Sequence, residues 1–361
     1  MSYKNFLFQA LISVYDLFSK PTQTNAIKKF LVVSTTALGD TIWATPAIKS
    51  LKETFPNSSI SVLTSSIGSQ VLKNNPYIDE VFLLKKTSLI QLCKLYLQMR
   101  KRFFTTALFF HTSQRPILPF CYMLGIREII GTKGLQKGLD SLLSTAVEKK
   151  PMHEIERRLK IIECLGAPAT STQLEIYPQN HHHQEAQAWL ENHGFSFTTP
   201  IVALHPGAST RFRQADPKVM SEVAKLLKKN HKCQILITGT LQEKSLVEEI
   251  IKLVPGAVGL TENLNLHTFA ALIGKMSALV VGDTGPMHIG FAMKTPTVAL
   301  FPASNPLSFG PYHISTNLVK VFHKPLTCTP CLYKKCQLPF CFLQFSPKEI
   351  CDSVHDLLSK R

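Results

Sequence analysis

Short apolar runs alternate along the chain with stretches in which apolar residues recur at helical spacing, beginning near Phe30. Short continuous apolar runs predict buried strands, and helical spacing between them predicts crossover helices. In the first half the predicted strands are Phe30–Ser34, Ser59–Thr64, Glu80–Leu84 and Thr106–Phe110, with a helix at Ile48–Phe55. This alternation is typical of a parallel sheet covered by helices on both faces.

The same alternation restarts after a polar stretch at Ala167–Gln184, where His181, His182 and His183 read as solvated linker or the start of a helix. The second series of predicted elements comprises strands Pro200–His205, Cys233–Thr238, Ala278–Val281 and Thr297–Phe301, and helices Pro217–Lys229, Leu246–Leu253 and Met287–Met293. We therefore predict an α/β protein of two domains, residues 29–175 and 176–361, with parallel sheets facing a central cleft. Ligands of such folds bind at the carboxyl ends of the strands.

Residues 1–28 precede the first series and are rich in large apolar side chains. They predict a helix that is apolar around most of its circumference. Such a helix either packs on the first domain or lies on a membrane surface, and the sequence leaves both open.

Composition places the chain among globular proteins, with 45% hydrophobic and 18% charged residues in a length of 361. No apolar run is long enough to span a bilayer and no signal peptide is recognisable, so we expect a cytoplasmic protein, with peripheral attachment to the inner membrane as a further expectation. The formal net charge of +16 attracts nucleic acid, acidic membrane or a phosphorylated substrate alike.

The loop after the first predicted strand contains Gly39, Asp40 and Thr41. Asp40 could cap the next helix, but Pro46 fits the first helical position and makes Thr45 the better cap. Asp40 is then expected in the loop, where a carboxylate is placed to act as a general base on an acceptor hydroxyl.

Two loops of the second series have the character of anion sites. After the strand ending at His205, small residues and hydroxyls lead to a basic side chain, which makes Ser209, Thr210 and Arg213 candidate phosphate contacts. After the strand ending near Val281, Pro286 begins a helix, and the candidates there are Asp283, Thr284, Gly285 and His288. Amides at a helix amino end bind anions.

Cysteines crowd into the tail at residues 328–351. Cys328, Cys331, Cys336 and Cys341 have a spacing that suits a structural Zn²⁺ site. Reduced thiols or a redox pair explain the same residues, and we assign the tail no catalytic role.

Together, the three loops resemble glycosyltransferase family 9, the heptosyltransferases of lipopolysaccharide core synthesis. The resemblance rests on Ala37–Asp40 with Thr45–Ala47, on His205–Ser209 with Arg213, and on Gly282–His288. In place of the family's Lys-x-Trp-Pro, Arg213–Asp216 keeps the charge and loses the tryptophan.

The resemblance implies a GT-B fold of two Rossmann-like domains, with Asp40 as catalytic base beside Gly39 and Thr41 of the acceptor-side loop. It implies donor binding by Ser209, Thr210, Arg213, Asp283, Thr284, Gly285 and His288. The implied reaction is an inverting transfer of a heptose or related sugar, from ADP-heptose or another nucleotide sugar, to a lipid-linked saccharide at the cytoplasmic face of the inner membrane. No cofactor is expected for catalysis and no nucleic acid as partner.

Two alternatives are a basic nucleic-acid-binding protein with a cysteine-rich metal knuckle, and a sugar-nucleotide epimerase of the same fold.

Overall fold

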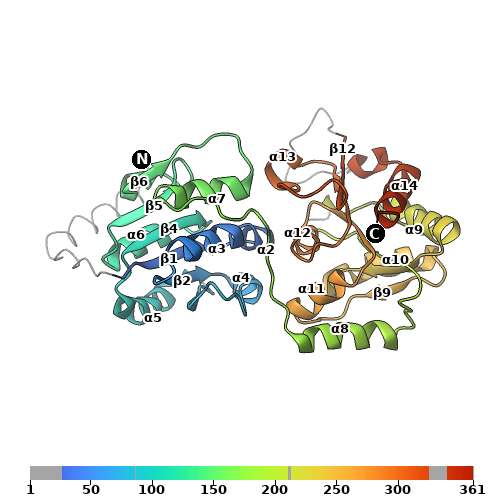
Figure 1. Cartoon of the computed structure of the whole chain (residues 1–361), viewed down its shortest axis with the longest axis horizontal. Coiled ribbons are helices and arrows are strands. Elements are labelled where there is room, and N and C mark those ends of the chain that lie inside the picture. Colours follow the sequence, from blue (N-terminus) through green and yellow to red (C-terminus); the bar gives the residue numbers. More distant parts are fainter. Residues whose placement is uncertain (1–26, 86, 210–212, 325–339, 361) are drawn as a thin grey trace. The chain divides into compact units, whose positions relative to one another are not determined.

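The structure is a computed structural model that describes residues 27–85, 87–209, 213–324 and 340–360. The chain forms two compact units, the first ending at Gln173 and the second beginning at Leu174 (Figure 1). Of the predicted N-terminal helix at residues 1–28, all but Ile27 and Lys28 lie outside the described residues. In the described part, no helix has both the length and the apolar content needed to cross a bilayer.

The first unit is built on a six-stranded parallel sheet with the order β3-β2-β1-β4-β5-β6. The strands are β1 (Lys29–Ser34), β2 (Ser59–Thr64), β3 (Glu80–Leu83), β4 (Thr106–His111), β5 (Glu128–Thr132) and β6 (Thr145–Val147). The helices are α2 (Leu38–Ile42), α3 (Thr45–Thr54), α4 (Ser66–Val71), α5 (Leu89–Met99), α6 (Ile117–Met123) and α7 (Glu154–Glu163), with 3-10 turns η1 (Arg100–Arg102) and η2 (Asp140–Leu142).

Alternate residues of the central strands supply two apolar layers. Leu31, Val33 and Phe109 belong to a core shared with side chains of α5 and α6. Helices α3 and α7 contact each other, and α7 also contacts β4 and β5. Because both faces are covered, the strands are continuous buried runs, as the sequence predicts.

The second unit repeats this plan with the order β12-β11-β10-β7-β8-β9, again all parallel. The strands are β7 (Ile201–His205), β8 (Gln234–Thr238), β9 (Val258–Leu260), β10 (Ala278–Gly282), β11 (Thr297–Phe301) and β12 (Val319–His323). The helices are α8 (Asn180–Asn192), α9 (Pro217–His231), α10 (Lys244–Leu253), α11 (Leu266–Gly274), α12 (Gly285–Ala292), α13 (Pro306–Phe309) and α14 (Pro347–Leu358), with 3-10 turns η4 (Leu241–Glu243) and η5 (Phe340–Gln344).

The last helix of the chain completes the core of the second unit. Ile350, Val354 and Leu357 of α14 are buried in one cluster with Val298 and Leu300 of β11. Helix α14 also packs on α9. The apolar core of this unit therefore depends on residues close to the carboxyl terminus.

In both sheets the first strand of the series lies beside the fourth, so the chain order reverses between β1 and β4 and between β7 and β10. Loops that leave these two strands diverge to opposite faces and leave room for a ligand. The predicted site loops follow β1, β7 and β10. The topology therefore puts them at the two places where doubly wound sheets bind ligands.

The histidine run belongs to α8 rather than to a solvated linker. Helix α8 begins at Asn180, and His182 is buried. The Nδ1 atom of His182 accepts the Gln179 N–H at 3.0 Å, which satisfies a free amide at the start of the helix. The helix-start interpretation is therefore correct, and full solvation of the run is not.

Candidate active site

Asp40 lies in the first turn of a short helix, which corrects its expected place in a loop. Helix α2 begins at Leu38, and the Asp40 Oδ2 atom accepts the Ala37 N–H at 3.3 Å. The next helix, α3, begins at Thr45, with Ala44 rather than Thr45 at the capping position. A carboxylate in the first turn of a helix compensates free amides there, which explains why α2 forms despite its shortness.

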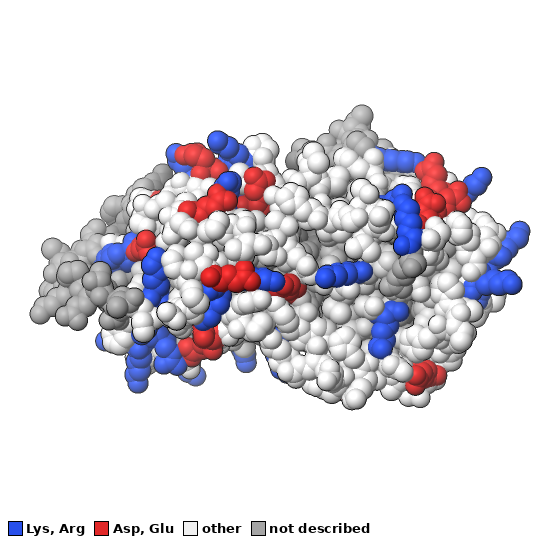
Figure 2. Space-filling model, viewed as in Figure 1, with Lys and Arg blue, Asp and Glu red and all other residues white. Residues whose placement is uncertain are grey.

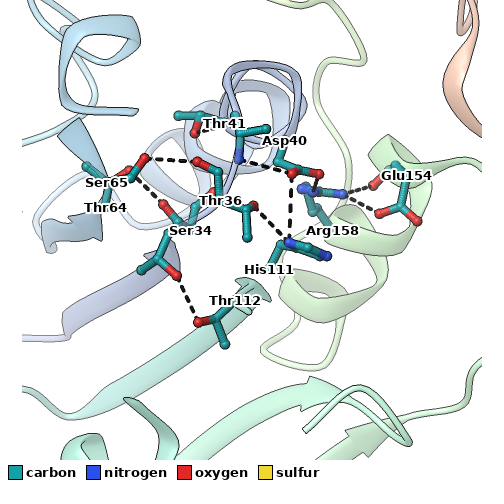
Figure 3. A network of polar contacts seen from close by, with 12 residues as sticks. Ser34, Thr36, Asp40, Thr41, Thr64, Ser65, His111, Thr112, Glu154 and Arg158 are labelled. Carbon is teal, nitrogen blue, oxygen red and sulfur yellow. Dashed lines mark hydrogen bonds and ion pairs between the residues drawn. The ribbon is translucent and has the colours of Figure 1, made fainter. Parts of the chain in front are cut away.

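A buried arginine and a histidine surround the Asp40 carboxylate (Figure 3). Arg158 on α7 has its Nη2 atom 3.5 Å from Asp40 Oδ1, and His111 at the end of β4 has its Nδ1 atom 3.8 Å from Asp40 Oδ2. The Arg158 side chain is fully buried, and its Nη1 atom donates at 2.8 Å to the Glu154 carboxylate and at 2.6 Å to the Glu154 carbonyl. Arg158 thus joins two carboxylates, one of them Asp40.

The titration of the neighbours fits this network. Burial raises the pKa of Glu154, but the charges and hydrogen bonds of Arg158 and Arg157 outweigh it and hold that pKa below its ordinary value. Burial lowers the pKa of His111, although the Asp40 charge opposes the shift. His111 is therefore neutral near pH 7, with its Nδ1 atom 2.8 Å from the Thr36 hydroxyl.

Gly39 and Thr41 accompany Asp40 in α2, but their groups are engaged in the helix itself. The Thr41 hydroxyl donates to the Ala37 carbonyl at 3.2 Å, and the Gly39 carbonyl accepts the Trp43 N–H at 2.9 Å. Thr41 is also fully buried. These bonds lie within helix α2 and its ends, and a contact of Gly39 or Thr41 with an acceptor stays a prediction.

Sequence reasoning missed the partners of Asp40. Glu154 and Arg158 are one helical turn apart, a spacing that signals an ion pair, but nothing in the sequence directs that pair toward α2. His111 could have been found from the sheet order, because β1 pairs with β4 and Ser34 lies opposite His111.

In the second unit, Arg213 and Asp283 join the loops that follow β7 and β10. The Arg213 Nη2 atom donates to Asp283 Oδ2 at 2.8 Å and to the Asp283 carbonyl at 3.3 Å. Burial raises the pKa of Asp283 above its ordinary value, although the hydrogen bond from Ser304 and the charge of Arg213 oppose the shift. The Arg213 side chain is about one-third exposed, so part of it is accessible to a ligand anion.

The remaining donor-site candidates differ in accessibility. Helix α12 begins at Gly285 with Thr284 as its cap, and the Thr284 hydroxyl bonds the Gly282 carbonyl at 3.4 Å instead of a helix amide. Ser209 is exposed, whereas Thr210 lies outside the described residues. His288 is only 3% exposed, and its ring meets the Phe291 ring edge-on. A ligand anion could contact the His288 side chain only if neighbouring side chains moved.

The turn after β7 packs against the carboxylate of Glu243, a residue that was not among the predicted site residues. A Cβ atom at Gly207 would meet the carboxylate of Glu243, so a larger residue there would displace that side chain. Glu243 accepts the Thr240 N–H at 2.8 Å. Burial lowers the pKa of the neighbouring His205 to about 4, although the Glu243 charge opposes it, so His205 is neutral and bonds Thr238.

The predicted zinc ligands cannot be placed together. Cys341 is half-buried in η5, whereas Cys328, Cys331 and Cys336 lie outside the described residues. Within the described part of the chain, no group of three or more His, Cys, Asp or Glu side chains could hold a metal ion. A zinc site in the tail stays a prediction.

The two Rossmann-like units, each with a parallel six-stranded sheet, have the GT-B fold. The chain belongs to glycosyltransferase family 9 (heptosyltransferase), whose model matches residues 117–341, a range that includes Arg213 and Asp283 but not Asp40. The resemblance noted from the motifs is thereby confirmed. Membership in this family favours a transferase over both the nucleic-acid-binding and the epimerase alternatives.

Individual relatives agree over nearly the whole chain. The sequence is 25% identical over 338 residues to lipooligosaccharide heptosyltransferase 2 of Campylobacter jejuni, covering 91% of this chain and 99% of that protein. It is 22% identical over 310 residues to the lipopolysaccharide core heptosyltransferase OpsX of Haemophilus influenzae, covering 84% and 87%. The structure of E. coli ADP-heptose lps heptosyltransferase II superposes with a TM-score of 0.73 at 19% identity, covering 92% and 98%.

Proposed function

We propose that this glycosyltransferase moves a heptose from ADP-heptose onto a lipopolysaccharide core or lipid A acceptor at the cytoplasmic face of the inner membrane. The names of the C. jejuni, H. influenzae and E. coli proteins support the sugar, the donor and the acceptor class. The observation that carries the proposal is the pairing of Arg213 with Asp283, which ties two anion-binding loops together at the switch point of the second sheet.

In the proposed reaction, Asp40 removes the proton from an acceptor hydroxyl as its oxygen bonds to the anomeric carbon of the heptose. The bond from that carbon to the diphosphate breaks on the opposite side, so the configuration inverts and the electron pair leaves with ADP. Arg213 and the amino end of α12 stabilise the charge that grows on the diphosphate. In this scheme the protein's own positive groups stabilise the leaving diphosphate, so the proposed reaction uses no cofactor.

Arg158 and Glu154 have a supporting role in this proposal. Glu154 holds the guanidinium by two hydrogen bonds through a single nitrogen, and the guanidinium in turn holds Asp40. A base fixed in this way faces the acceptor without having to reorganise during the reaction. His111, neutral and about one-third exposed, is a second proton acceptor beside it.

A donor screen tests the function. ADP-heptose at about a hundred times its Kd should raise the Tm by about 5 °C or more, because a ligand that binds only the folded state stabilises it by about 2.7 kcal/mol at that excess. UDP- and GDP-sugars serve as matched controls, and transfer to lipid A-linked core is followed by mass spectrometry. Stronger stabilisation by a UDP-sugar, or conversion of the donor without any acceptor, would contradict the proposal.

Arg213→Ala should weaken donor binding about tenfold or more, since a hydrogen bond between charged groups contributes about 1.5–3 kcal/mol. The Kd for ADP-heptose is measured by calorimetry. Lys218→Ala is the matched control, because Lys218 is an exposed cation a few residues away in the same unit. Equal donor affinity in the two variants would remove Arg213 from the donor site.

A further inference from the structure

Helix α5 and the turn that follows it expose large apolar side chains. Leu89 is 76% exposed, Ile90 72% and Leu97 60%, and Phe103 just after η1 is 56% exposed. These four residues come from one short segment of the first unit. Together with its cations, Lys94, Arg100 and Lys101, we call this surface the α5 face. Apolar side chains gathered in this way mark an interaction site more often than an ordinary surface.

The charge of the same segment is entirely positive. Residues 85–104 contain six lysines and arginines and no acidic residue. Arg102 is held by Glu80 of β3 through two hydrogen bonds of 2.8 Å, whereas Lys94, Arg100 and Lys101 are exposed. Figure 2 shows lysine and arginine side chains gathered at the lower left of the view, where Figure 1 places α5.

Apolar and basic positions occupy neighbouring arcs of the helix. Successive helical residues are about 100° apart, which puts Leu89, Ile90 and Leu97 on one arc. Lys94 and Gln98 continue the exposed side, while Leu95 and Met99 are buried against the sheet. The helix is thus anchored by one face and presents on the other an apolar strip, with Lys94 beside it and Arg100 and Lys101 just after its last residue.

A surface hollow adjoins this strip. It has a volume of about 840 Å³, and its charged lining consists of Lys85, Lys101 and the ion pair of Arg102 with Glu80, so in the described part of the chain the two lysines are its unpaired cations. Lysine side chains around a hollow suit the phosphate of a lipid headgroup, while the apolar strip suits the acyl region beneath it.

We infer that the α5 face docks on an anionic lipid bilayer. A second copy of the chain is a poorer fit, because a two-fold contact would bring the same cations together. Nucleic acid would leave the apolar strip without a partner. An anionic bilayer satisfies both parts of the face, since cations bind its surface charge and apolar side chains enter its interface. This inference deepens the proposed function by naming the surface that meets the membrane of a lipid-linked acceptor.

Vesicle flotation with the full chain tests the inference without any turnover. The protein should float with vesicles containing phosphatidylglycerol and much less with pure phosphatidylcholine. Lys94→Glu combined with Lys101→Glu should lower the partition coefficient at least about tenfold, and added salt should weaken binding of the unchanged protein. Leu89→Ser combined with Leu97→Ser should lower it through loss of apolar burial.

Matched controls come from exposed positions of the second unit. Lys229→Glu combined with Lys252→Glu makes the same charge change, and Leu307→Ser removes an apolar side chain that is 81% exposed. These controls should bind within about twofold of the unchanged protein. Transfer to a detergent-dispersed acceptor should persist in the α5 variants, which separates loss of docking from loss of activity. Equal vesicle binding by the α5 variants and the controls would overturn the inference.

Discussion

Asp40→Asn should lower kcat for heptose transfer about a thousandfold while the Kd for the donor changes by less than about twofold. A general base contributes about 10²–10⁴ to the rate, and an amide cannot take a proton from the acceptor. Asparagine has the size of aspartate, and its oxygen can still accept the Ala37 N–H that Asp40 accepts. The change therefore removes the base and leaves helix α2 in place.

Single-turnover transfer and donor calorimetry measure the two halves of this prediction. Glu156→Gln is the matched control, because it neutralises another partly exposed carboxylate in the first unit, on α7. Its kcat should stay within about twofold. Should Asp40→Asn turn over at the control rate, the proton would have to go elsewhere, and His111 would be the first residue to test.

Arg158→Met should lower the free energy of unfolding of the first unit by about 3–5 kcal/mol, the usual result of breaking a buried ion pair from one side. The guanidinium is fully buried, and among the described residues its loss leaves the Glu154 carboxylate with only the 3.2 Å hydrogen bond from Arg157 Nε. Total stabilities of domains are about 5–15 kcal/mol, so the loss is large. Transfer should fall as well, because Asp40 loses the cation that holds it.

Trp43 offers a local probe for this measurement, since its ring lies 5.5 Å from the Arg158 guanidinium carbon. The chain has two tryptophans, and Trp189→Phe leaves Trp43 as the reporter of the first unit in urea titrations. Glu154→Met combined with Arg158→Met should recover part of the lost stability, because the carboxylate that Arg158 had paired is then gone, although the buried Arg157 loses its own bond to Glu154. Arg158→Lys should keep part of the transfer rate that Arg158→Met loses. A double variant as unstable as Arg158→Met would show that the loss comes from packing rather than from a stranded charge.

Most of the central strands could be predicted because burial on both faces requires an unbroken apolar run. The interior strand β5 was missed, since its large apolar residues are only Ile129 and Ile130 before Gly131. The predicted bounds of β2 and β11 match those in the structure. Among the edge strands β3 was predicted, whereas β6 and β12 were not, because their partly exposed residues form no continuous apolar run. Helix α5 went unpredicted because its exposed side is apolar too, which blurs the helical period.

For the site, the sequence predicted which loops matter but not what surrounds them. Asp283 and Arg213 were both candidates, and the adjacency of β7 and β10 brings them into contact. Arg158 was missed because buried arginines are rare. Its position beside the Asp40 carboxylate of α2 depends on how α7 packs, which is a tertiary contact that the local sequence does not indicate. The placement of Asp40 in a helix was missed because α2 is only five residues long.

The positions along the chain of the residues that form each core determine the order in which the two units can fold during synthesis. All strand pairs of the first sheet lie within residues 29–147, so this unit can assemble while the ribosome is still making the second. The core of the second unit includes Ile350, Val354 and Leu357 of α14, so it closes only after Pro347–Leu358 have been made. A nascent chain will therefore hold a completed first unit while the part of the second core that α14 covers, around β10 and β11, is still open, and a stop codon shortly before α14 would leave that part uncovered.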